Sequence, residues 1–110
     1  MVEQLFPVDA PSRVSGGTVT FSPGARTHWH THPYGQVLLI TAGAGRVQME
    51  GGPIQEVHAG DVVRIPAHVK HWHGAAPDST MTHIAIQDNL DGTAVDWLEP
   101  VTQKQYSGGK

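Results

Sequence analysis

Apolar and β-branched residues recur along the chain in short runs, several of which alternate with polar residues. Glycine, proline and aspartate interrupt these runs at intervals of about 8–12 positions, a spacing typical of β-sandwiches and barrels. The pattern predicts about ten short strands, among them residues 2–6, 14–21, 36–41, 46–50, 54–57, 62–65, 71–75, 81–87 and 94–99. Helix is expected only after Thr102, which is placed to cap a short segment ending at residues 107–109. The expected fold is therefore all-β.

Glycine-rich segments set the expected turns. Ala42-Gly43-Ala44-Gly45 is expected to turn the chain between two strands, and Gly51-Gly52 to close a hairpin. Residues 36–41 are apolar and β-branched, as in a strand buried on both faces.

Length and charge narrow the classes of function. With 110 residues, the chain is expected to form one domain, residues 1–110, whose modest core favours association into a homodimer or homotetramer. A net charge of −3 without a basic stripe argues against nucleic acid as a partner. There are no cysteines, so thiolate metal sites and disulfides are excluded. No apolar run reaches membrane-spanning length, and residues 1–13 lack the features of a signal peptide, so a cytoplasmic location is expected.

Histidine is the unusual component, with eight in the chain. His30 and His32 are two positions apart, so on a strand their side chains project from the same face. Pro33-Tyr34-Gly35 reads as a turn that can bring Gln36 beside them. Two imidazoles and an amide oxygen make most of a metal site. His71 is the leading candidate for the missing ligand, and His73, on the same strand face, is its rival.

The spacing of these residues resembles the two motifs of the cupin family. Gly24, His30, His32, Gln36 and Gly43 follow the first motif, and Gly60, Pro66 and His71 follow the second, so the core motifs span residues 24–43 and 60–75. The departures are Gln36 in place of a glutamate, His68 in place of a glycine and Ala75 in place of an asparagine. The resemblance implies a double-sheet jelly-roll barrel with one metal ion held by His30, His32, Gln36 and His71.

The strings WHTHPYGQ, HWHGAAP and MTHIAIQ are similar to a narrower group, the manganese-dependent bacterial cupin hydroxynitrile lyases. These enzymes cleave cyanohydrins into an aldehyde and hydrogen cyanide, or form cyanohydrins from these two compounds. The resemblance implies manganese as the preferred ion and His83 and Gln87 as pocket residues. Histidine and glutamine also accept iron, cobalt, nickel, copper and zinc, so these stay as alternatives.

Other residues are expected to build a small pocket or to have structural roles. Gly17, Val19, Leu38, Ile40 and Ala85 share the expected cavity face and indicate a compact apolar pocket for a small aldehyde or aryl compound. His83 and His73 are candidates for proton transfer. The alternative for His83 is an ordinary core histidine. Gln87 is a candidate donor of a hydrogen bond or proton to cyanide. His28 is expected at the rim, His58 and His68 at the surface, and Trp29 and Trp72 in packing behind the ligands.

Four neutral ligands would leave the charge of a divalent ion uncancelled and make it a stronger Lewis acid. The site lacks the two-histidine, one-carboxylate set of many iron oxygenases, which weighs against oxygen activation. The leading hypothesis is a metal-dependent lyase of the hydroxynitrile type. The alternatives are another small-cupin metalloenzyme (a dioxygenase, isomerase or decarboxylase) and a non-catalytic cupin that binds a small ligand.

Overall fold

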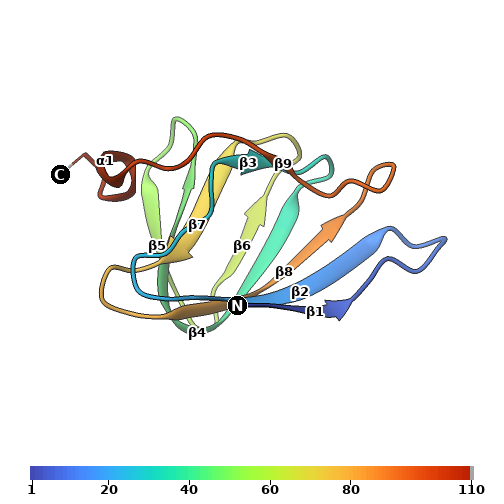
Figure 1. Cartoon of the computed structure of the whole chain (residues 1–110), viewed down its shortest axis with the longest axis horizontal. Helices are drawn as coiled ribbons and strands as arrows, with labels where there is room; N and C mark the ends of the chain where they lie inside the picture. The colour runs from blue at the N-terminus through green and yellow to red at the C-terminus, as the bar shows by residue number, and fades with distance from the viewer. Residues whose placement is uncertain (110) are drawn as a thin grey trace.

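The computed structural model describes residues 1–109, and within them nine strands curl into a half-open barrel with one short helix at its side (Figure 1). Lys110, the last residue of the expected domain, lies outside the described residues. The strands are β1 (Val2–Phe6), β2 (Val14–Phe21), β3 (His30–Thr31), β4 (Gln36–Met49), β5 (Ile54–His58), β6 (Val62–Ile65), β7 (His71–Ala75), β8 (Met81–Asp88) and β9 (Asp96–Trp97), and the helix is α1 (Gln103–Tyr106). The expected all-β fold with a short terminal helix is confirmed.

Two antiparallel sheets share the long strand β4, which bends from one into the other. Its first half pairs with β8 and β6, and β8 continues through β2 to β1. Its second half pairs with β5 and β7, and β7 continues through β3 to β9. Figure 1 shows β3 and β9 along one side of the curled sheet and β1 and β2 along the other. The two sheets enclose the interior in which the histidines lie.

The turn expected at residues 42–45 is wrong, because β4 runs through this segment without a break. Gly43 has a φ of +76°, and the pairing with β8 shifts between Ile40 and Ala42. A bulge of this kind bends a strand while the pairing resumes on either side. A side chain at Gly43 would collide with the carbonyl oxygen of Thr80, so glycine is required at the bend.

A second, smaller core lies behind the sheet that carries β7. Trp29, Trp72, Val101 and Tyr106 are buried together, and the Tyr106 hydroxyl donates to the Ala75 carbonyl at 2.6 Å. Thr102 caps α1 with a reciprocal capping box, as its position predicted. The expected packing role of the two tryptophans is therefore confirmed. No helix within residues 1–109 is long and apolar enough to cross a membrane.

Candidate metal centre

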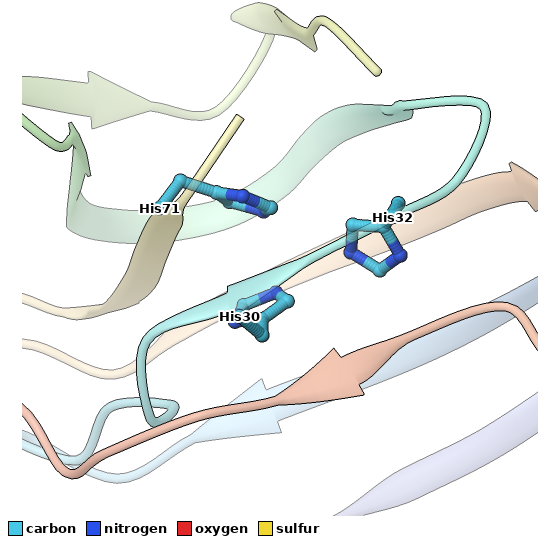
Figure 2. Close-up of side chains that lie close together, drawn as sticks. All are labelled: His30, His32 and His71. Carbon is cyan, nitrogen blue, oxygen red and sulfur yellow. The ribbon is translucent and has the colours of Figure 1, made fainter. Parts of the chain in front are cut away.

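Three histidines from two segments converge inside the barrel. His30 lies on β3 and pairs directly with His71 on β7, while His32 follows β3 with its side chain on the same face as His30. One nitrogen from each ring can be chosen so that all three lie within 4.8 Å of one another. Figure 2 shows the three rings gathered between β7 and the segment that carries His30 and His32. The spacing of His30 and His32 and the choice of His71 thus predicted this cluster.

The outer nitrogen of each ring is held by a backbone carbonyl. Nδ1 lies 2.8 Å from the His28 oxygen in His30, 2.7 Å from the Ala94 oxygen in His32 and 2.9 Å from the Val69 oxygen in His71. A carbonyl oxygen only accepts hydrogen bonds, so each Nδ1 carries the proton and each Nε2 keeps its lone pair. The backbone therefore sets all three histidines in the tautomer that a metal ion needs.

Burial keeps these rings neutral. It lowers the pKa of His30 to about 3, helped by the nearby His71, and it lowers the pKa of His71 to about 4. The pKa of His32 is lowered as well, again chiefly by burial. Near pH 7 the lone pairs are available without the loss of a proton.

Gln36 completes the group from the start of β4. Its Oε1 lies 3.3 Å from Nε2 of His71, and both atoms are acceptors in the tautomer described above. Nε2 of His32 is buried and has no hydrogen-bond partner. Lone pairs that face one another and a buried nitrogen without a donor fit a divalent cation bound among these four side chains.

A cavity of about 370 Å³ opens beside this cluster and is bounded by His30, His32, Gln36, His73, His83 and Gln87. Its remaining walls are mainly apolar and come from Val2, Gly17, Val19, Phe21, Thr27, Ala85, Ala94, Val95 and Trp97. Gly17, Val19 and Ala85 lie in the expected wall. Leu38 and Ile40 do not line it. They share the inward face of β4 with Gln36, but they are packed within the hydrophobic core together with Phe21 and Ala85.

His73 and His83 form a buried pair at the wall of the cavity. Nε2 of His83 lies 3.0 Å from Nδ1 of His73, and the other nitrogen of each ring is buried without a partner. Burial lowers the pKa of His83 to about 4 and that of His73 well below its usual value. The Phe21 ring packs at 5.5 Å from His83 and 5.9 Å from His73, between ring centroids. His73 therefore adjoins the cluster but bonds to His83.

Residues 94–97 also contribute to the site, which the sequence alone did not indicate. The Ala94 carbonyl accepts from His32, and Trp97 pairs with His30 across β3 and β9, with its ring 4.8 Å from the His30 ring. Trp97 is 61% exposed, at the mouth of the cavity. Strand alternation places Val95 and Trp97 on one face, but nothing local indicates which face. His28, His58 and His68 are exposed, as predicted.

Comparisons with known proteins found a matching family model, a similar sequence and similar folds. A family model described as "Cupin domain" matches residues 17–86. An (R)-mandelonitrile lyase of Granulicella tundricola is 58% identical over 105 residues, which cover 96% of this chain and 80% of that protein. The fold is similar to the crystal structure of a cupin-like protein from Thermotoga maritima, with a TM-score of 0.90 and 42% sequence identity. The match covers 98% of this chain and 82% of the Thermotoga chain.

A more distant structure shows the same fold. The DMSP lyase DddQ from Ruegeria pomeroyi has a TM-score of 0.77 and 20% identity, over 94% of this chain and 53% of its own. This likeness shows the fold alone, whereas the family model and the relative at 58% identity confirm the resemblance drawn from the two motifs.

Proposed function

The chain belongs to the cupin family, and from this premise we propose that it is a metal-dependent hydroxynitrile lyase, which splits a cyanohydrin into an aldehyde and hydrogen cyanide. The observation that carries the proposal is the 58% identity to an (R)-mandelonitrile lyase over 96% of the chain. His30, His32, Gln36 and His71 are the proposed metal ligands. Manganese is the proposed ion, and iron, cobalt, nickel, copper and zinc suit the same donors.

Four neutral ligands support the choice of chemistry. A divalent ion bound by them keeps its full charge and would act as a Lewis acid toward the substrate oxygen. The proposed ligand set has no carboxylate, unlike the set of many oxygen-activating iron enzymes. The centre is therefore better suited to polarising an oxygen atom than to oxidation.

The cavity supports a small, partly aromatic substrate. Its volume of about 370 Å³ is at the lower end of the range for small-molecule sites, about 300–1,000 Å³. Val19, Phe21, Ala85 and Trp97 offer apolar surface to an aryl or alkyl group. His30, His32 and Gln36 are among the polar side chains that line the cavity, so the hydroxyl of the substrate would face the proposed metal ligands.

The His73–His83 pair supplies a path for protons. When Nε2–H of His83 donates to Nδ1 of His73, Nδ1 of His83 is free to accept the hydroxyl proton of the cyanohydrin. The bond between the carbinol carbon and cyanide breaks as the carbonyl forms, and its electron pair leaves with cyanide. Nε2–H of His73 then protonates cyanide. As His73 gives up this proton, the proton on Nε2 of His83 passes to Nδ1 of His73, so the pair takes up one proton, releases one and leaves both rings neutral, as burial favours.

An uncovered apolar face supports a homo-oligomer, either a dimer or a tetramer. On the outside of the sheet formed by β1, β2, β8, β4 and β6, Val37 pairs with Ile86, and Leu39 pairs with both Ile84 and Val62. We call these five residues the outer patch. All five are partly or fully exposed, although polar residues usually cover the solvated face of an antiparallel sheet. Contiguous exposed apolar surface commonly marks an interface, and a second copy offers the same apolar face.

The reaction is tested with purified protein loaded with manganese. Cleavage of mandelonitrile is followed by the absorbance of benzaldehyde, with the chelator-stripped protein and His71→Ala as controls. We expect turnover by the loaded parent alone. No turnover across several aromatic cyanohydrins by fully loaded protein would contradict the proposed reaction. Oxygen consumption with small aldehydes or phenols would favour a dioxygenase instead.

A further inference from the structure

Three polar side chains form a row across the sheet and end at the histidine cluster. Ser15 on β2 lies directly opposite Gln87 on β8. Gln36 on β4 precedes Val37, which pairs with Ile86, so Gln36 is the next neighbour of Gln87 on its other side. Gln87 Nε2 donates to Ser15 Oγ at 3.1 Å and to the Ser15 backbone oxygen at 3.5 Å, and Gln87 Oε1 accepts from Gln36 Nε2 at 3.1 Å.

The row has a fixed direction because it begins at a backbone carbonyl. The carbonyl oxygen of Ser15 only accepts, so the end of Gln87 that faces it must be the NH₂ group. The Oε1 of Gln87 therefore points to Gln36 and requires a donor there. As a result, the NH₂ group of Gln36 faces Gln87 and its Oε1 faces His71.

The opposite orientation of Gln36 would disable the centre. With its amide reversed, Nε2 of Gln36 could donate to Nε2 of His71, which is an acceptor 3.3 Å from the present Oε1. That bond would occupy the lone pair of one proposed ligand and turn the oxygen of another away. It is an attractive alternative for the metal-free site, because it pairs an acceptor that otherwise faces another acceptor.

We propose that Gln87, anchored on Ser15, is a positioning residue that holds the carbonyl oxygen of Gln36 toward the histidines and so preorganises the site for metal. This inference rests on the proposed function, because it assumes that His30, His32, Gln36 and His71 bind the ion. It also gives Gln87 a role other than that of a donor to cyanide, since both ends of its amide are already engaged.

The inference is tested by metal affinity, which does not depend on turnover. The dissociation constant for Mn²⁺ is measured by competition with a fluorescent chelator for the parent and for Gln87→Met, which keeps the length of the side chain but neither donates nor accepts strongly. We expect affinity to fall about 10–100-fold, as is typical when a partner of a metal ligand is removed. Gln55→Met, at an exposed position on β5, is the matched control and should bind as the parent does.

A double-mutant cycle separates positioning from a general structural effect. If Gln87 acts through Gln36, then adding Gln87→Met to Gln36→Met should change affinity by no more than about twofold. Equal losses in both backgrounds would overturn the inference, as would parent-like affinity of Gln87→Met. Gln87→Glu is a second variant: its oxygens still accept from Gln36, so affinity should be at least that of the parent, and a loss as large as that of Gln87→Met would also overturn it.

Failure of this inference can be told apart from failure of the proposed function. Absence of Mn²⁺ binding by the parent would overturn the inference together with the metal centre. Metal binding with the expected cycle, but without cleavage of any cyanohydrin, would overturn the proposed reaction and leave the role of Gln87 supported.

Discussion

Oε1 of Gln36 and Nε2 of His71 face one another at 3.3 Å, and both carry lone pairs toward the same point. The Val69 carbonyl holds the proton of His71 on Nδ1, and Gln87 holds the NH₂ group of Gln36 away from the cluster. Two acceptors at this distance repel each other in the absence of a proton or cation between them. This relationship carries the assignment of the metal centre and suggests how to test it.

Removal of single histidines should empty the centre. His71→Ala and His30→Ala each take away one of four proposed ligands, so we expect less than about one tenth of the metal content of the parent by elemental analysis. His58→Ala removes an exposed histidine and should retain a full equivalent. A full equivalent of metal in both ligand variants would refute the assignment.

The neutrality of Gln36 should matter for the reaction. Gln36→Glu places a negative charge beside the ion, so the variant should bind manganese at least as tightly as the parent. The same charge weakens the attraction of the centre for a developing alkoxide, and cleavage of mandelonitrile should fall about tenfold or more. Affinity and rate are measured on the same preparation. Equal affinity with an equal rate would show that the charge of this ligand is unimportant.

The metal-free protein should lose stability in mild acid. Histidine in the unfolded chain has a pKa of about 6.5, whereas burial lowers the folded-state pKa of His30 to about 3 and those of His71 and His83 to about 4. Between these values the unfolded state binds more protons, so the free energy of unfolding decreases as the pH falls from about 6.5 toward 4. Each histidine contributes a slope of about 1.4 kcal/mol per pH unit.

Urea unfolding of chelator-stripped protein at several pH values from 7 to 4 measures this slope. His83→Gln lacks one titrating group, so its free energy of unfolding should depend less steeply on pH, by the contribution of one histidine. A free energy of unfolding that stays constant from pH 7 to pH 4 would mean that the buried rings are not held neutral by the fold.

Much of the architecture could be predicted because it depends on local pattern. Val14–Phe21, Val62–Ile65 and His71–Ala75 form strands with the bounds expected from their apolar runs and turn residues. The residues around Gly43 could not be interpreted correctly, because glycines produce a similar pattern in a turn and in a bulge. Which of the two forms depends on whether β8 is there to continue the pairing.

In the candidate site, too, some residues could be predicted from local sequence and others could not. Alternation along a strand placed His30 and His32 together, and motif spacing selected His71 over His73. The contribution of Ala94 and Trp97 depends on contacts across about sixty residues, which only closure of the barrel creates. The role inferred for Gln87 depends on the register of three strands, which local sequence does not specify.

Charges on the outer patch should dissociate the proposed oligomer. Leu39→Lys and Ile84→Lys lie opposite one another on β4 and β8 with their side chains outside the barrel. Like charges placed on both copies of an apolar interface repel and resist desolvation, so the double variant should elute and scatter light as a monomer. Gln55→Lys on β5 is the control for added charge. A parent that is itself monomeric at high micromolar concentration would refute the role of this patch.

The pair formed by His83 and His73 leads to the sharpest prediction about the reaction. His83 touches no proposed metal ligand through a hydrogen bond, since its Nε2 is engaged by Nδ1 of His73. His83→Ala should therefore keep a full equivalent of manganese. It removes the group that accepts the hydroxyl proton, and placed general bases contribute about 10²–10⁴-fold, so cleavage of mandelonitrile should fall by roughly that factor.

His83→Gln refines the test, because glutamine can still bond to His73 but cannot take up a proton. If His83 only supports the cavity wall, His83→Gln should be nearly as active as the parent. If it is the base, His83→Gln should be as slow as His83→Ala. The rate of benzaldehyde release under single-turnover conditions, with metal content measured on the same samples, distinguishes the two. An unchanged rate in both variants would remove His83 from the mechanism while leaving the metal centre intact.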